Sequence, residues 1–244
     1  MGRRGSMAAV FKAYILCILF WANSPELQAQ HCVRRQEIAR YDSTHVRSEA
    51  WYCGNKLDSI YTEWYRTGEI KEKGHYSNGA KVGTWEKCEY NSSTHTRGIK
   101  TFSEYKEGFL VEERSYEFVD SMQFLSSVKN YSYNDLSHDT VELERQFYPE
   151  TGMMIQMDTL INGLPNGIWR FWDRDNGRLF GETYFKMGRQ TLDKKYDTQN
   201  RTTVVHYFDN GWAKKDEFVY DCTGKLISEK HYDEKGKLTS EKKY

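Results

Sequence analysis

Two stretches of the chain share one spacing of asparagine, glycine and tryptophan. Residues 65–85 read YRTGEIKEKGHYSNGAKVGTW, and residues 148–169 read YPETGMMIQMDTLINGLPNGIW. Five pairs of identical Asn, Gly or Trp residues lie at a single offset of 84 residues. The pairs are Gly68 and Gly152, Asn78 and Asn162, Gly79 and Gly163, Gly83 and Gly167, and Trp85 and Trp169. One pattern at one offset predicts the same local structure twice, so we expect a chain built of repeats.

The match continues beyond the tryptophans with a shorter offset. Gly98 aligns with Gly177, and Tyr105 aligns with Tyr184, each at a distance of 79 residues. The first copy therefore carries five additional residues, which we place within residues 91–96 (NSSTHT). This is the pattern expected of a loop insertion between two strands.

The C-terminal residues repeat with a period of twelve. Tyr220, Tyr232 and Tyr244 recur at this interval, and so do Gly224 and Gly236. Eight extended residues make a strand of about 26 Å at ~3.3 Å per residue, and the other four make a turn. Glycine supplies the positive φ that such turns need, and Asn-Gly pairs are typical of tight hairpins. The sequence therefore predicts an all-β fold, an antiparallel meander of hairpins that forms one elongated, solenoid-like sheet.

The spacing N-G-x-x-x-G-x-W, followed by G-x-[LI] and an aromatic residue, resembles the MORN-repeat variant of the YwqK-type antitoxin-like proteins. The resemblance covers residues 57–110 and 143–244, which we treat as two repeat blocks. It implies a sheet of hairpins that acts through contact with a partner, with no catalytic residue and no cofactor. The residues that carry it are Asn78, Gly79, Gly83 and Trp85 in the first block, and Asn162, Gly163, Gly167, Trp169, Gly177, Leu179, Tyr184, Gly224, Tyr232, Gly236 and Tyr244 in the second.

The first residues have the features of a targeting segment. Arg3, Arg4 and Lys12 precede an apolar run, AYILCILFWA, at residues 13–22. This run is too short to span a bilayer of ~30 Å as a helix, but it suits the core of a signal peptide. We predict a signal peptide at residues 1–29, with an uncleaved anchor as the alternative. The chain is then exported, and is periplasmic, envelope-associated or secreted.

A lipid anchor is not expected, because lipidation needs a small residue before the modified cysteine. Cys17 follows Leu16, and Cys32 follows His31. Cleavage would remove three of the 35 basic and one of the 35 acidic residues, which leaves a formal charge of −2. Nucleic-acid-binding proteins normally carry an excess of Lys and Arg, so no nucleic-acid partner is expected.

Four cysteines would remain after cleavage, namely Cys32, Cys53, Cys88 and Cys222. In an exported chain they permit two disulfides, and four cysteines allow three connectivities. Cys32 and Cys53 close the shortest loop and are the preferred pair. They would pin a less regular N-terminal cap at residues 30–56. The alternative for Cys88 and Cys222 is that both are buried thiols.

No recognisable catalytic or metal-binding motif occurs in the chain. The seven histidines form neither H-E-x-x-H nor H-x-H, and there is no G-x-S-x-G. WDRDNG at residues 172–177 lacks the ligand spacing of an EF-hand and is better explained as a hairpin turn. We therefore expect neither an enzyme nor a metal site. The histidines are His31, His45, His75, His95, His138, His206 and His231.

Residues 111–142 match neither repeat block. Phe118, Met122, Phe124 and Leu125 have near-helical spacing, whereas NYSYND at residues 130–135 alternates as a strand does. We expect a connector that folds over the sheet. The functional alternative is an insertion that binds a partner, because loops on a rigid scaffold often carry recognition.

These observations favour an exported, non-catalytic interaction module, antitoxin- or immunity-like, with an exported protein as its partner. Recognition would use a sheet face rich in tyrosine and charge, or the exposed final strand, where Lys242 and Lys243 guard against aggregation. Two alternatives stay open. One is a module that associates with a membrane surface or the cell wall, and the other is a hydrolase of an envelope polymer.

Overall fold

The computed structural model describes residues 32–90, 97–119, 122–209 and 211–244, and these residues form eighteen β-strands and no helix. From the N-terminus they are β1 (Arg34–Arg40), β2 (Val46–Cys53), β3 (Lys56–Trp64), β4 (Ile70–Ser77), β5 (Ala80–Tyr90), β6 (Arg97–Lys106), β7 (Phe109–Val119), β8 (Met122–Asn134) and β9 (Asp139–Phe147). They continue with β10 (Met154–Ile161), β11 (Leu164–Pro165), β12 (Gly167–Trp172), β13 (Leu179–Lys186), β14 (Arg189–Tyr196), β15 (Thr202–Tyr207), β16 (Lys214–Tyr220), β17 (Leu226–Tyr232) and β18 (Leu238–Lys243).

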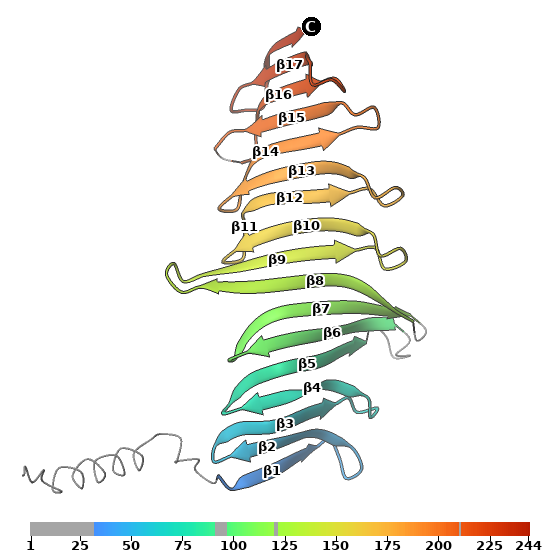
Figure 1. Cartoon of the computed structure of the whole chain (residues 1–244), viewed down its shortest axis with the longest axis vertical. Helices are drawn as coiled ribbons and strands as arrows, with labels where there is room; N and C mark the ends of the chain where they lie inside the picture. The colour runs from blue at the N-terminus through green and yellow to red at the C-terminus, as the bar shows by residue number, and fades with distance from the viewer. Residues whose placement is uncertain (1–31, 91–96, 120–121, 210) are drawn as a thin grey trace, which may run out of the picture.

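All strands belong to one open antiparallel sheet, the meander that the repeats predict. Each strand pairs with the next along the chain from β1 to β10, and again from β12 to β18. β10 pairs with both β12 and the two-residue β11, which together form the next rung. The sheet therefore rises as a single stack with β1 and β18 at its two edges (Figure 1).

Tight turns join the strands on one side of the stack. Asn78 and Gly79 have φ values of 51° and 89°, so both are left-handed, as a type I′ hairpin requires. Asn162 and Gly163 have φ values of 52° and 76° and form the same turn. The two Asn-Gly pairs of the repeat therefore have one physical role, which is to reverse the chain within two residues.

Longer turns, several of them closed by an aspartate, join the strands on the other side. At Asp173, Asp197 and Asp221, one carboxylate oxygen accepts two backbone N–H groups from the residues that follow. The N–H of Gly224 also returns to the carbonyl of Asp221. Asp233 forms the same turn between β17 and β18, which lies on the side of the Asn-Gly turns. The twelve-residue period is thus one strand plus one aspartate-capped turn.

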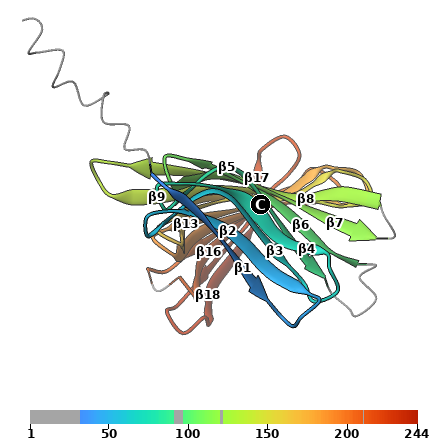
Figure 2. The same cartoon turned by 90° about the horizontal axis from the view of Figure 1, so that it is seen from below.

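The sheet has a single layer, and little of it is buried. Among the described residues, the buried hydrophobic side chains are Ala50, Trp85, Cys88, Val128 and Val205. Viewed along the stack, successive strands rotate relative to one another, so the sheet twists (Figure 2). Both faces of the sheet are consequently available to solvent, with aromatic contacts and ion pairs in place of a thick core.

Two segments differ from the expectations based on sequence. The described part of residues 111–142 does not fold over the sheet, because it lies in β7, β8 and β9 and in the turn between β8 and β9. Phe118 and Met122 are four residues apart, as neighbours on a helix face are, but they lie on two paired strands, β7 and β8. Residues 30–56 are not an irregular cap either. Their described part contains the regular hairpin of β1 and β2. The sequence of β1, RRQEIAR, is mostly charged or polar and so lacks the alternation of apolar and polar residues by which a strand is recognised.

Two predictions lie outside the described residues, namely the signal peptide at residues 1–29 and the insertion within residues 91–96. Two of the seven histidines, His31 and His95, also lie outside them. Among the residues that the structure describes, no helix is long and apolar enough to cross a membrane.

Candidate functional site

The repeat-signature residues form a structural frame and do not converge on one site. The indole N–H of Trp85 donates to the carbonyl of His75 at 3.1 Å, and that of Trp169 donates to Thr159 at 3.2 Å. The two tryptophans therefore pin equivalent strand pairs. Signature residues with positive φ at turns or bulges are Asn78, Gly79, Gly83, Asn162, Gly163, Gly167, Gly177, Gly224 and Gly236. Tyr184 lies in β13, Tyr232 ends β17, and Tyr244 follows β18.

Trp85 is the centre of an aromatic cluster on one face of the sheet. It is 2% exposed and contacts the rings of Tyr61, Tyr76 and Tyr105, with centroids 4.8–6.4 Å away. The ammonium of Lys81 lies 3.9 Å from the ring centroid of Trp85. Burial, assisted by neighbouring carboxylates, raises the pKa of Tyr61 to about 12. The cluster is filled by its own lysine, so it works as packing in this one-layer sheet.

The second repeat replaces the glycine beneath the tryptophan with an acid. Gly74 lies under Trp85, and the residue 84 positions later is Asp158. Asp158 is 4% exposed, and one of its oxygens accepts a bond from Gln156 at 2.7 Å while the other has no partner. Burial raises the pKa of this carboxyl. On the two strands that precede β10, the ammonium of Lys129 in β8 forms ion pairs with the carboxylates of Glu142 at 2.9 Å and Glu144 at 3.3 Å in β9.

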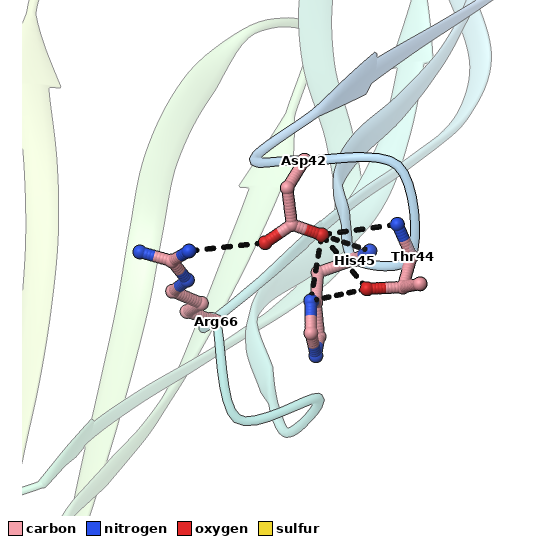
Figure 3. Close-up of polar contacts among 4 residues, drawn as sticks. All are labelled: Asp42, Thr44, His45 and Arg66. Carbon is pink, nitrogen blue, oxygen red and sulfur yellow. Dashed lines mark hydrogen bonds and ion pairs between the residues drawn. The ribbon is translucent and has the colours of Figure 1, made fainter.

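A second polar cluster fixes the turn between β1 and β2 (Figure 3). One oxygen of Asp42 accepts the backbone N–H groups of Thr44 and His45 at 3.0 and 2.9 Å, and lies 2.8 Å from the His45 imidazole Nδ1. The other accepts from the guanidinium of Arg66 at 3.1 Å, in the turn after β3. The His45 contact, with the N–H bonds, holds the pKa of Asp42 well below its usual range. The cluster links two neighbouring turns and favours the ionised form of Asp42.

The described histidines belong to strands and turns of the sheet. His75, His206 and His231 lie in strands, and His231 bonds to Asp216 at 2.7 Å. In the part of the chain that the structure describes, no three His, Cys, Asp or Glu side chains are grouped so as to hold a metal ion.

The cysteines divide into one bridge and two thiols. The structure contains the Cys32–Cys53 disulfide, the pair with the shortest loop, at a sequence separation of 21. Cys88 is buried, as expected of a structural thiol. Cys222 is exposed and corrects the expectation that both thiols are buried, because it lies in the turn after β16.

Three large apolar side chains are exposed at the turn between β8 and β9 and at the start of the neighbouring strand β7. Phe109, Tyr133 and Leu136 are 63%, 49% and 96% exposed. The rings of Phe109 and Tyr133 stack at 6.2 Å with an interplanar angle of 14°. This β8–β9 hairpin projects beyond its neighbours at the left of Figure 1. We call these three residues the hairpin tip.

The hairpin tip is held in a defined shape. The side-chain oxygen of Asn134 accepts the backbone N–H groups of Leu136 and Ser137 at 3.0 and 3.2 Å. The hydroxyl of Tyr133 lies 3.0 Å from Nδ1 of His138. Exposed apolar groups on a pre-organised turn are typical of a protein-binding surface, because little conformational entropy is lost on binding.

The sequence located this region only in part. The partner-binding alternative for residues 111–142 covers Tyr133 and Leu136 but not Phe109. The individual side chains were missed, because only a pairing register places Phe109 beside Tyr133. The available signal was Leu136 itself, a lone aliphatic residue within the polar turn NDLSHD.

Neither a protein-family model nor a curated protein matches this chain. Among solved structures, a protein of unknown function from Bacteroides fragilis NCTC 9343 is 11% identical over 63% of this chain and 96% of its own, with a TM-score of 0.23. A chain of the TcdB2-TccC3 structure is 10% identical over 86% of this chain and 18% of its own, also with a TM-score of 0.23. At these scores neither likeness bears on the function of this chain.

Proposed function

We propose that this protein is an exported, non-catalytic interaction module that binds another exported protein through the hairpin tip. The observation that carries the proposal is the exposure of Leu136 in the β8–β9 turn, next to a strand end where the exposed rings of Tyr133 (β8) and Phe109 (β7) stack on each other. Aromatic and aliphatic side chains of this kind supply most of the binding energy in protein interfaces once a partner covers them. The one-layer sheet is the scaffold that presents them.

The inhibitory role is the second part of the proposal. The signature residues around Trp85 and Trp169 resemble the antitoxin-like MORN variant, and the apolar run at residues 13–22 favours export. A protein that meets both conditions acts outside the cytoplasm, in the manner of an immunity protein that neutralises an exported toxin by covering it.

The test is capture of the partner from the protein's own cells. The full chain, tagged at its C-terminus, is recovered from the exported fraction, and its co-purifying proteins are quantified by mass spectrometry. The expected result is one exported protein in stoichiometric amount. The triple variant Phe109→Ser, Tyr133→Ser, Leu136→Ser should lose it, because the variant removes the apolar contact area and leaves the strand pairing intact.

The matched control is Met122→Ser. Met122 is also an exposed apolar residue of β8, 61% accessible, but it lies at the other end of that strand. Capture should survive this change. A partner that the triple variant still binds would contradict the hairpin tip as the site. Recovery of the chain from the cytoplasm alone would contradict export. The inhibitory role then requires that the captured protein lose its toxicity when the chain is added.

A further inference from the structure

β1 is an edge of the open sheet that offers its backbone to a further strand. Of the strands that the structure describes, β2 alone pairs with β1, and β1 ends the stack opposite β18 (Figure 1). Every residue of β1 is exposed. The backbone N–H and C=O groups along such an edge form a template for another strand. Which strand fits depends on the side chains that would face each other across the new pairing.

The side chains of β1 carry both signs of charge on one face of the strand. Arg35 and Glu37 are two residues apart, so they lie on the same face, and their charged groups form an ion pair of 2.7 Å. The two side chains are 62% and 50% exposed, which leaves both of them accessible to a second pair of charges. Another copy of the same strand supplies such a pair.

Symmetry limits the register in which two copies of β1 can meet. Antiparallel copies that extend one sheet are related by a two-fold axis normal to it, so one residue of each strand faces its own copy. With Gln36 on the axis, Arg35 faces Glu37 of the second copy, and Glu37 faces its Arg35. The central residue is then a neutral amide. An axis at Arg35 or at Glu37 would place a charge against its own copy.

The same register covers the exposed aliphatic side chains of this edge. Val33 is 86% exposed and would face Ala39 of the second copy. Ile38 is 49% exposed and would face Arg34, whose guanidinium is held by Asp58 at 3.3 Å in its own chain. The methylene stem of Arg34 is therefore available to pack on Ile38. Residues 33–39 are symmetric about Gln36, and they end where a register shift interrupts the β1–β2 pairing.

The opposite edge of the sheet lacks this complementarity. In β18, Glu241 and Lys243 are also two residues apart and form an ion pair of 3.8 Å. The symmetric register that would cross these two charges between copies puts Lys242 on the axis, against its own copy. Like charges directly opposite each other are destabilising. The two edges therefore differ in the residue at the centre, and β1 alone has a neutral one.

We propose that β1 pairs with β1 of a second copy of this chain, antiparallel and with Gln36 on the two-fold axis. The two chains then form one continuous sheet. A single pair of strands covers less surface than the ~1,600 Å² of a standard interface, so we expect a dissociation constant in the micromolar range. This contact is separate from the hairpin tip, which lies at β7 and the β8–β9 turn.

Light scattering on a size-exclusion column tests the proposal with the purified full chain at a series of concentrations. The mass should rise from that of one chain to that of two and stop there. Arg35→Glu places like charges at both crossed pairs, and so does Glu37→Arg. Each single variant should raise the dissociation constant about tenfold or more. The double variant Arg35→Glu, Glu37→Arg crosses opposite charges again and should restore the dimer.

The matched control is Lys243→Glu, which reverses one charge of the corresponding pair on the other edge strand. It should dimerise as the unchanged chain does, and circular dichroism checks that every variant keeps its β-sheet. The proposal is overturned if the unchanged chain stays monomeric up to near-millimolar concentration. Growth beyond two chains also overturns it, because this would indicate head-to-tail pairing of β1 with β18. The same holds if the double variant stays monomeric or if Lys243→Glu dissociates the dimer.

Discussion

Gly74 illustrates how a one-layer sheet depends on single atoms. Its backbone lies directly beneath the Trp85 indole, and a Cβ at this position would overlap the ring. Gly74 does not have a positive φ, so the requirement for glycine is one of space alone. Because few residues are buried in this fold, the Trp85 cluster carries an unusually large share of its packing.

We predict that Gly74→Ala lowers the free energy of unfolding by about 1–3 kcal/mol, the usual cost of overpacking a core. The control is Gly181→Ala, another strand glycine without positive φ, where the added Cβ would lie 3.5 Å from the carbonyl of Lys194 in ordinary contact. Urea unfolding, monitored by tryptophan fluorescence, measures the free energy of unfolding of both variants. Equal midpoints for the two variants would show that Trp85 moves aside at no cost.

Asp158 gives a prediction about pH. Burial raises its pKa above the usual 3.8, so the folded chain binds this proton more tightly than the unfolded chain does. The stability that this group contributes is present below pH 3.8 and is lost as the pH rises through the folded-state pKa. Asp158→Asn removes the penalty, because the amide stays neutral beside Glu144 and Glu142. The variant should therefore gain stability relative to the unchanged chain as the pH rises to neutral.

Thermal unfolding of both chains across that pH range measures the difference. Asp135→Asn, a change at an exposed turn residue, is the control for loss of one negative charge from the chain. An Asp158→Asn variant that is less stable than the unchanged chain at neutral pH would show that the carboxylate form is needed for folding.

At the scale of the element, turns were predictable and strands much less so. Asn-Gly pairs and regularly spaced glycines indicate positions where the backbone needs a positive φ. Asn78 and Gly163 have this positive φ in the structure. Strands of an exposed sheet have no apolar face to alternate with a polar one. β1 shows this, since every residue of RRQEIAR is exposed. The pairing of β7 with β8 also depends on register, which no local spacing of Phe118 reveals.

β1 also gives a prediction about the disulfide. This strand is a sheet edge that pairs with β2 alone, and the Cys32–Cys53 bridge ties its start to the end of β2. In the chain-entropy model, a bridge that closes a loop of this length raises the free energy of unfolding by about 3 kcal/mol. Reduction should therefore release β1 while the rest of the sheet stays folded. Hydrogen exchange with and without reductant should show faster exchange confined to β1 and its partner.

The double variant Cys32→Ser, Cys53→Ser supplies the control for reduction. It should exchange quickly at β1 in both conditions, whereas Cys222→Ser should behave as the unchanged chain does, because Cys222 is outside the bridge. Unchanged protection of β1 after verified reduction would mean that backbone pairing alone holds this edge.

At the scale of the molecule, the free energy of unfolding of a meander is approximately the sum of contributions from pairs of neighbouring strands. β17 pairs only with β16 and β18, and the described strands offer no second layer to join distant rungs. Folded repeat arrays of this kind tolerate the loss of a terminal unit, since each unit is stabilised by its nearest neighbours.

We therefore predict that a chain ending at Asp221, without β17 and β18, folds its remaining strands. Circular dichroism should show the β-sheet signal reduced only by the share of the lost strands, and hydrogen exchange should show β2 to β14 protected as before. β16 becomes the new edge and should exchange faster, because its pairing with β17 is removed. If the shortened chain is instead wholly unfolded, the sheet folds as one cooperative unit and the sum over neighbours does not describe it.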